Sequence, residues 1–410
     1  MELMKDRYSS VTMYQIKTLI FAIPFLMGLG IDLYVPSLPA IANSFNSPKT
    51  AVQLSIATYM FGYGIGQFFL GIISDSLGRR LILKICSIVF VLSSLLCIFL
   101  SPSIYWLNFW RFIQGLSIAG LAVVARAMIV DVFSGKDLFK FTNYFGLCWS
   151  LGPIIGPNIG GYLQNYFNWQ ANFLFFAVYG LVLAFVSFNR FPETNNNLKK
   201  IGESFNTDNI KTVALDTRFL IYCFIGGVGY GVIVLFNVVG PFLLQKKYLI
   251  TPIQYGHYAL LLGFAYFLGS LTNKKLVDTH KNGDILMLGL SACVAISITF
   301  SLWSQYSVSS LKIIISGLFL IFFFIGFIVP NTLANSMKIF PSRAGTASSI
   351  FGTLTGVIVS VISSVGSATI LLTASSLFFN YIFYFLISLF LFLFLVIKIR
   401  FISMNGDNNE

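Results

Sequence analysis

Long apolar runs separated by short polar stretches make up most of the sequence. Twelve of these runs are about 20 residues long, and at about 1.5 Å of rise per residue each can form a helix that crosses the roughly 30 Å apolar core of a bilayer. They begin near residues 17, 51, 81, 105, 139, 169, 218, 253, 284, 311, 344 and 377. The pattern predicts an all-α integral membrane protein with twelve transmembrane helices.

A long polar stretch, rich in Asn and Lys, runs from residue 191 to residue 216 in the middle of the chain. Its composition is typical of a cytosolic linker, here between two six-helix bundles, residues 1–190 and 217–410. The halves resemble each other weakly, since residues 71–75 after the second run have a counterpart in residues 269–273 after the eighth. Transporters with such repeats bind their substrate between the halves, near the middle of the membrane.

The composition excludes a water-soluble protein. Hydrophobic residues make up 57% of the chain and charged residues 10%, whereas soluble domains carry roughly 25% charge. The net charge of +12 would suit nucleic acid only if the basic residues were clustered on a water-facing surface. They are scattered between the apolar runs instead, so we expect a lipid bilayer and no nucleic-acid partner.

The basic residues predict the orientation in the membrane. With the N-terminus in the cytosol, twenty of the 26 basic residues fall on the cytosolic side, and the others are Lys49, Arg111, Arg126, Lys246, Lys247 and Lys312. Loops rich in Lys and Arg stay in the cytosol during insertion. The sequence therefore predicts a multi-pass protein with both termini cytosolic.

Asp32 is the one acidic residue of 14 that falls inside a predicted span. It lies 15 residues past Lys17, which is about 22 Å along a helix. Arg111 enters the fourth helix from the outside and reaches a comparable depth, so the two side chains could pair across a cavity. A charge in the apolar core costs about 2.5 to 3.5 kcal/mol, and such residues therefore mark function by default.

A carboxylate next to a basic group in a low-dielectric site can bind and release protons near physiological pH. If a cationic substrate displaces the proton from Asp32, exchange follows from competition for one negative charge. The alternative is that Asp32 and Arg111 form a structural ion pair.

The loop after the second run is a tight turn with one acid and two cations. Its charges can bond to a neighbouring helix end and lock a cytosolic gate in one state. A solvated loop that only obeys the positive-inside rule is the alternative. The residues of interest here are Gly71, Asp75, Gly78, Arg79 and Arg80.

The fifth helix combines small residues at every fourth position with two Gly-Pro pairs. Gly at this spacing permits close helix contact, and Pro bends a helix because it removes a backbone hydrogen bond. Ordinary packing is the alternative. The residues are Gly152, Pro153, Gly156, Pro157, Gly160 and Gly161.

Other polar residues within spans are candidates for contact with a substrate. Asn237 in the seventh span and Asn331 and Asn335 in the tenth either face the cavity or form hydrogen bonds between helices. For Arg126, near the cytosolic end of the fourth span, we expect a structural contact with a loop carboxylate.

Metal, cofactor and enzyme chemistry are not expected. His257 and His280 have no acidic partners at ligand spacing, and the five cysteines form no CxxC motif. The sequence has no GxxxxGK[ST] motif for ATP, and no catalytic cluster is visible within the spans. A proton gradient is the expected energy source.

Together these motifs resemble the major facilitator superfamily over essentially the whole chain. The loop motif of that family matches Gly71, Asp75, Gly78, Arg79 and Arg80, its fourth-helix RxxQG motif matches Arg111, Gln114 and Gly115, and its antiporter motif GxxxGPxxGG matches residues 152–161. The resemblance implies two pseudo-symmetric six-helix bundles that alternate between inward-open and outward-open states.

More narrowly, the chain is similar to the twelve-span drug/proton antiporters of the bicyclomycin and chloramphenicol resistance type. The similarity rests on residues 32–36, which include Tyr34, on residues 125–131, which include Arg126 and Asp131, and on residues 344–348. It implies roles for Asp32 and Arg111 in substrate and proton coupling and for Asp75 in gating, and Tyr34 is a candidate for the cavity. Ser76 departs from the loop motif, which usually has a basic residue there, and this puts one gating salt bridge in doubt.

The function expected from the sequence is proton-coupled export of drugs or other small amphipathic compounds. A dedicated exporter of a metabolite or siderophore and a proton-symport importer of a nutrient are the alternatives, and the antiporter motif favours export. We expect a monomer in the cytoplasmic membrane of a bacterium, with a small-molecule substrate and protons as its partners.

Overall fold

The computed structural model describes residues 10–189, 192–195, 198, 207–306, 310–340, 344–368 and 373–406. All regular structure in these residues is helical, and twelve long helices make up most of it. In the first half they are α2 (Ser10–Asp32), α4 (Lys49–Leu77), α5 (Arg79–Phe99), α6 (Ile104–Val132), α7 (Gly135–Tyr166) and α8 (Gln170–Phe188). In the second half they are α11 (Thr217–Pro241), α12 (Pro252–Leu276), α13 (Asn282–Tyr306), α14 (Leu311–Ile339), α15 (Ala344–Ala368) and α16 (Ala374–Gly406). Each coincides with one of the twelve apolar runs, so the predicted fold class is confirmed.

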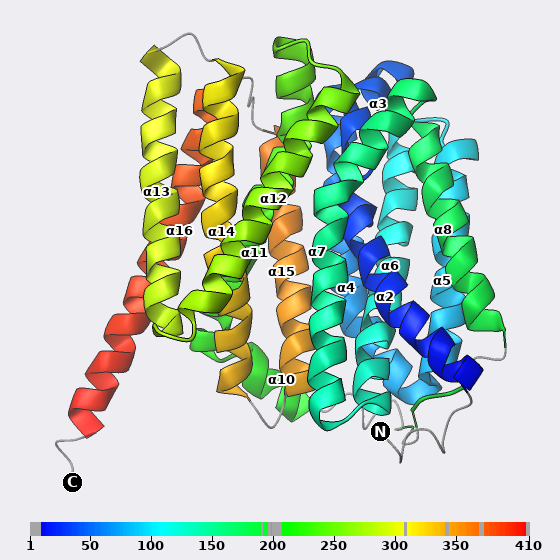
Figure 1. Ribbon diagram of the computed structural model, residues 1–410, viewed down its shortest axis with the longest axis horizontal. Helices are drawn as coiled ribbons and strands as arrows, with labels where there is room; N and C mark the ends of the chain where they lie inside the picture. The colour runs from blue at the N-terminus through cyan, green and yellow to red at the C-terminus, as the bar shows by residue number, and fades with distance from the viewer. Residues whose placement is uncertain are drawn as a thin grey trace.

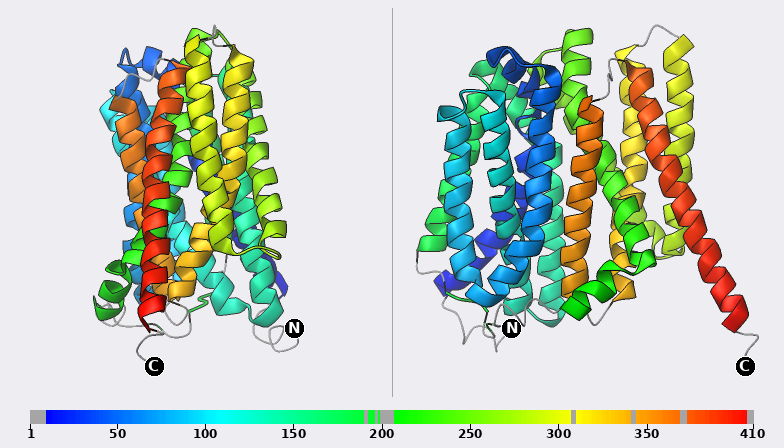
Figure 2. Two further views of the ribbon diagram at one scale, coloured as in Figure 1. Left: turned by 90° about the vertical axis from the view of Figure 1, so that its left-hand side faces the viewer. Right: turned by 180° about the vertical axis from the view of Figure 1, so that it is seen from behind.

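The long helices form two groups that lie side by side. In Figure 1, α2 to α8 form the right-hand group and α11 to α16 the left-hand group. The groups meet where α4 packs against α15 and α7 packs against α12. The ends of α2 at Ser10 and of α16 at Gly406 lie at the same end of the molecule, called the terminal end below, and α16 leans away from the other helices there (Figure 2). The other end is called the far end.

Ten of the helices in the described part of the chain are long and apolar enough to cross a membrane. Helices α7 and α12 are not among these ten, although they lie beside the others (Figure 1). Both carry Gly, Pro and amide side chains, and they pack against each other between the two groups. One side of each helix is therefore used for packing against the other group, which accounts for its lower hydropathy, while side chains such as Leu147 on α7 and Phe264 on α12 remain exposed.

Large apolar side chains also cover the outside of the molecule. Phe185 on α8 and Phe390 on α16 are 72% and 70% exposed, and many other large apolar residues share this exposure. A surface so apolar would not remain soluble in water, but it matches the hydrocarbon chains of a bilayer. The protein is therefore a multi-pass membrane protein.

Local sequence explains where several helices begin and end. Gly78 has a φ of +94° between α4 and α5, a backbone conformation that favours glycine. The carboxylate of Asp216 accepts a hydrogen bond from the backbone of Phe219 and caps α11, and Thr251 and Gln254 form a capping box at the start of α12.

The boundaries of the two halves, near residues 190 and 216, stay a prediction. The short helix α10 (Thr207–Ala214) lies within the predicted linker and packs against α11 and α15. Residues 191, 196, 197 and 199–206 of that linker lie outside the described part of the chain.

Candidate substrate and coupling site

Two interrupted helices, one from each half, meet near the far end. Helix α2 stops at Asp32 and the chain continues through a 3₁₀ turn, η1 (Val35–Ser37), into the short helix α3 (Leu38–Ser44). Helix α11 stops at Pro241 and continues as a π-helix, η2 (Phe242–Lys247). Prolines at both breaks remove backbone donors. Interrupted helices at corresponding positions of two halves are where transporters form their binding sites.

A cavity lies beside these breaks, between the two halves. Its volume is about 50 Å³, which is enough for a few water molecules. It is lined from both halves by Asp32, Trp149, Ser150, Pro153, Ile154, Pro157, Tyr230, Ile233, Phe236, Asn237, Ala259, Leu262, Gly263, Tyr266 and Phe322. The walls are thus mostly aromatic and aliphatic, with one carboxylate and one amide among them, as is usual for a small-molecule site.

Among the residues that the structure describes, Asp32 is the only charged one that lines this cavity. Its side chain is only 3% exposed and accepts a hydrogen bond from the Nδ2 atom of Asn237 on α11. No other hydrogen bond to the Asp32 carboxylate is formed within the described part of the chain. The one charge in the cavity is therefore held by a single neutral group, and that group belongs to the opposite half.

The expected pair between Asp32 and Arg111 is not formed, and that prediction is wrong for this state. Arg111 on α6 is fully buried and donates to the carbonyl oxygen of Gly30 (2.9 Å) and to the amide oxygen of Gln114. Its guanidinium also lies over the rings of Tyr34 (4.3 Å) and Tyr59 (4.1 Å). A Cβ atom at Gly30 would meet the hydroxyl of Tyr59, on which Arg111 stacks, whereas the Cβ atom of Asp32 lies beside Gly156 on α7. Positions two apart on a helix point to nearly opposite sides, so Asp32 lies on the side away from Arg111.

Arg111 contributes to the break in the first helix. The Tyr34 amide does not bond to the Gly30 carbonyl, as it would in a continuous helix, and Arg111 donates to that carbonyl instead. A buried carbonyl without a partner is costly. The contact therefore stabilises the interrupted backbone that carries Asp32. Tyr34 itself bonds to Ser55 at 2.8 Å and does not line the cavity.

Several hydrogen bonds close the far end by joining the two halves. Gln53 on α4 donates to the carbonyl of Val238 at 2.8 Å, and Gln245 on η2 donates to the carbonyl of Pro36 at 2.8 Å. Further in, about two turns from the far ends of α4 and α15, the Ser360 hydroxyl on α15 donates to the Ala57 carbonyl at 2.8 Å. The structure is therefore closed at the far end by contacts that can be broken and remade.

The glycines of α7 allow close contact on two sides. A Cβ atom at Gly160 would overlap the carbonyl oxygen of Leu33 just beyond the break in α2, and a Cβ at Gly161 would overlap the carbonyl oxygen of Pro252 on α12. Gly152 and Gly156 likewise lie against α2, while Pro153 and Pro157 line the cavity. Helix α7 therefore packs on both halves at once.

The other candidates from the sequence lie elsewhere. Asn331 donates to Asn273 at 2.6 Å and is buried between α12 and α14. Asn335 lines a separate hollow near the terminal end, with Arg218 and Lys338 among its neighbours. Only Asn237 of the three reaches the cavity.

Arg126 bonds to no loop carboxylate among the described residues, and that prediction is also wrong. Its guanidinium donates to the amide oxygen of Gln67 at 2.5 Å and to the Ala122 carbonyl at 3.3 Å. Its position, one and a half turns before the end of α6, faces α4 rather than the loop. The backbone carbonyl of Gln67 also accepts a bond from Ser349 on α15 at 3.4 Å, so Arg126 lies beside a contact between the halves.

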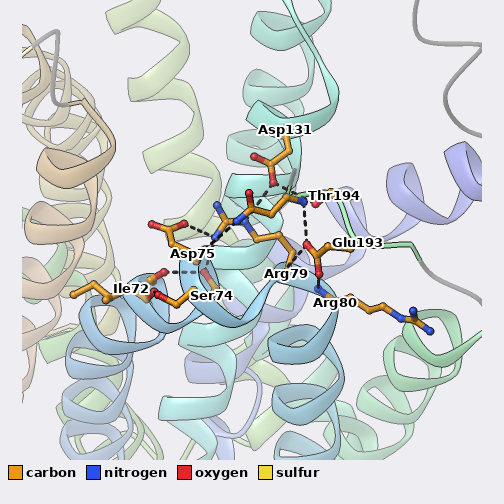
Figure 3. Close-up of polar contacts among 11 residues, drawn as sticks. Ile72, Ser74, Asp75, Arg79, Arg80, Asp131, Glu193 and Thr194 are labelled. Atoms are coloured by element: carbon orange, nitrogen blue, oxygen red, sulfur yellow. Dashed lines mark hydrogen bonds and ion pairs between the residues drawn. The ribbon is translucent and has the colours of Figure 1, made fainter. Parts of the chain in front are cut away.

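A cluster of charges lies at the terminal end, around Arg79 (Figure 3). Arg79 pairs with Asp75 at 2.5 Å and with Asp131 at 3.3 Å, and donates to the hydroxyl of Ser74 at 2.8 Å. The predicted loop motif and the end of the fourth helix are thus brought together. The Thr194 hydroxyl also donates to Asp131, at 3.2 Å.

Glu193 also belongs to this cluster and was not predicted from the sequence. Its two carboxylate oxygens accept the backbone N–H groups of Arg79 (2.9 Å) and Arg80 (3.0 Å), which are the first residues of α5. A carboxylate at a helix N-terminus satisfies free donors and interacts favourably with the helix dipole. The sequence does contain a signal for it: Glu193 follows Pro192 directly after the sixth apolar run, which ends on the same predicted side of the membrane as Arg79 and Arg80.

No group of three His, Cys, Asp or Glu residues in the described part of the chain is placed to hold a metal ion. The residues that define the site are thus a carboxylate, an amide and aromatic walls between two groups of helices. This arrangement is that of a membrane transporter for a small molecule.

Comparison with known proteins gives the family: the chain belongs to the major facilitator superfamily, whose model matches residues 20–364. It is 30% identical over 355 residues to the MFS-type transporter YdgK of Bacillus subtilis, covering 83% of this chain and 87% of that one. It is 26% identical over 356 residues to the bicyclomycin resistance protein homolog of Haemophilus influenzae, covering 86% and 88%. The similarity to the bicyclomycin resistance type is therefore confirmed, and the protein is a transporter and not an enzyme.

The fold agrees with a solved member of the class. The crystal structure of a D-xylose-proton symporter superposes with a TM-score of 0.72 over 93% of this chain and 97% of that chain, at 14% identity. At this identity the likeness shows the shared fold alone.

Proposed function

We propose that this protein exports small amphipathic compounds, drugs among them, across the bacterial cytoplasmic membrane in exchange for protons. The observation that carries the proposal is the position of Asp32, which is buried, lines the cavity between the halves and bonds to the opposite half. One carboxylate can hold a proton or the charged end of a substrate, and the two compete. Drug-like cargo is supported by the relative that is a bicyclomycin resistance protein homolog.

Alternating access follows from how the halves touch. The terminal end is proposed to face the cytosol, because most basic residues outside the spans gather there. The far end is then the outer gate, closed here by Gln53 and Gln245. Release of substrate to the outside requires these bonds to break while the terminal end closes. One chain supplies both halves, so we propose that it works as a monomer.

The charge cluster around Arg79 is proposed to set the balance between the two states. It ties the ends of α4 and α6 and the start of α5 into one unit through Asp75 and Asp131. A rigid unit at the terminal end lets the first half move as a body. The role proposed for Asp75 and Arg79 is therefore mechanical, whereas that of Asp32 is chemical.

The test uses inverted membrane vesicles with an imposed proton gradient and a pH-sensitive dye. Lipophilic amines and antibiotics are added in turn, and dissipation of the gradient reports proton-coupled transport. We expect at least one compound to elicit a response in the wild type and none to do so in Asp32→Asn. Asp278→Asn, at an exposed position after α12, is the matched control and keeps the response. If Asp32→Asn transported normally, or if both variants failed alike while folded, the proposal would be wrong.

A further inference from the structure

Within the cavity, the hydrogen bond between Asn237 and Asp32 indicates which chemical group of a substrate the site binds. We propose that Asn237 occupies the place of the substrate's N–H donor on Asp32 in the empty transporter, so that the site selects compounds with an N–H group beside an aromatic or apolar body. The inference rests on the proposed function, since it assumes that substrate binds at Asp32. It adds the chemical class that the site prefers.

The contact between Asn237 and Asp32 is buried and lies in the cavity wall. Asn237 is 5% exposed and Asp32 3% exposed, and both line the cavity. The amide donates an N–H to the carboxylate, so the bond depends on a donor hydrogen and not only on charge. A buried carboxylate that loses this donor without a replacement is left unsatisfied, which is costly.

The same contact joins the two halves. Asn237 comes from α11 and Asp32 from α2, and the neighbouring residue Val238 accepts a bond from Gln53 on α4. A substrate that takes over the Asp32 carboxylate therefore also releases the second half from the first at this point. Substrate binding and parting of the halves then become one event, as transport requires.

The walls of the cavity are rich in aromatic rings. Trp149, Tyr230, Phe236, Tyr266 and Phe322 surround the carboxylate and the amide. Their rings attract any cation, whether or not it carries an N–H group. Two cations that share the aromatic body and differ only in N–H against N–CH3 gain similarly from the walls, so a large difference in their affinities reports the hydrogen bond to Asp32.

The probes are a matched pair: dimethyl(naphthylmethyl)amine, which is protonated at pH 7 and has one N–H, and its quaternary trimethyl analogue, which has none. Binding to the purified full-length protein in detergent is measured by equilibrium dialysis. We expect the N–H amine to bind at least about tenfold more tightly, because the quaternary ion leaves the carboxylate without a donor. Equal affinities for the two probes, or no binding of either, would overturn the inference.

Substitution of Asn237 shows whether this residue competes with the substrate for Asp32 or only packs against it. In Asn237→Leu neither probe has to displace an amide from Asp32, so both should bind several-fold more tightly than in the wild type, and the N–H amine should keep its advantage over the quaternary ion. Asn380→Leu, on the outer helix α16, is the matched control and leaves both affinities unchanged. If Asn237→Leu is folded and binds the N–H amine no better than the wild type, Asn237 is a packing residue and the inference fails.

Failure of the proposed function gives a different pattern. If Asp32→Asn binds both probes as the wild type does, the carboxylate plays no part in binding, and the proposed function falls together with the inference. If only the difference between the probes is missing while Asp32→Asn still weakens both, the proposed function stands and the inference alone is overturned. The pair of probes on the wild type needs no variant, so a misfolded variant cannot hide the outcome.

Discussion

The cavity and the terminal cluster handle charge in opposite ways. In the cavity, Asp32 stands alone with one neutral hydrogen-bond partner. In the cluster, Arg79 has two carboxylate partners and a hydroxyl. A charge with one neutral partner can exchange that partner for a proton or a ligand at little cost, whereas removal of one member of a multiple ion pair leaves the others uncompensated. The difference separates a site that must change partners from a site that must keep them.

The largest effect is expected at Arg111, a buried charge whose hydrogen-bond acceptors are an amide oxygen and a backbone carbonyl instead of a carboxylate. Arg111→Lys keeps the charge but loses the planar fork that reaches Gly30 and Gln114 and stacks on Tyr34 and Tyr59. We expect a loss of about 2 to 3 kcal/mol in the stability of the interrupted first helix. Transport should fall by roughly 30-fold or more, measured as initial rates in vesicles.

A conserved rate in Arg111→Lys would show that charge alone matters at this position. Arg111→Gln is the companion variant: it can still donate an N–H but has no charge. If the backbone contact to Gly30 is the function of Arg111, the Lys and Gln variants are both impaired. If an electrostatic effect on Asp32 were the function, the Lys variant would be the less impaired of the two.

Arg79 tests the terminal cluster, where a charge has to keep its partners. Arg79→Gln removes the pairs with Asp75 and Asp131, both of them at the terminal end and partly in water. We expect a loss of about 1 to 2 kcal/mol and a fall in transport of about tenfold, with substrate affinity unchanged. Arg80→Gln is the control, since the Arg80 side chain points away from the cluster in Figure 3. A change in substrate affinity in Arg79→Gln would contradict a mechanical role.

The sequence predicted the helices well and the contacts between them poorly. The twelve apolar runs follow from the thickness of the bilayer, so each run had to be a helix. The bond between Asp32 and Asn237 joins residues 205 positions apart, and only the packing of two interrupted helices brings them together. The sequence predicts how deep Arg111 and Asp32 lie in the membrane, but not the direction in which each side chain points around its helix. The predicted pair between them was wrong for this reason. The aromatic walls were hidden among 44 Phe and 19 Tyr residues that carry no distinguishing signal.

Glu193 gives a smaller effect than Arg79. Its carboxylate accepts two backbone N–H groups at the start of α5, so Glu193→Ala removes a helix cap and should cost about 1 kcal/mol. Glu193→Gln keeps one acceptor oxygen and should cost about half as much. The readout is the midpoint of thermal unfolding of the purified protein. Equal midpoints for the wild type and Glu193→Ala would show that the cap does not contribute.

Asp216 provides the smallest effect and one that depends on pH. Burial would raise the pKa of this carboxyl, but hydrogen bonds from Arg218 and from the backbone of Phe219 outweigh it and hold the pKa below its ordinary value. A pKa that is lower in the folded state adds stability above the unfolded pKa of about 3.9, and this stability is lost as the pH falls further. Asp216→Asn still caps α11, so at pH 7 it should cost only a few tenths of a kcal/mol to about 1 kcal/mol. Thermal midpoints of wild type and variant should differ at pH 7 and converge as the pH falls through the lowered pKa of Asp216. A difference that persists in acid, where Asp216 is protonated, would mean that its charge is not what stabilises the start of α11.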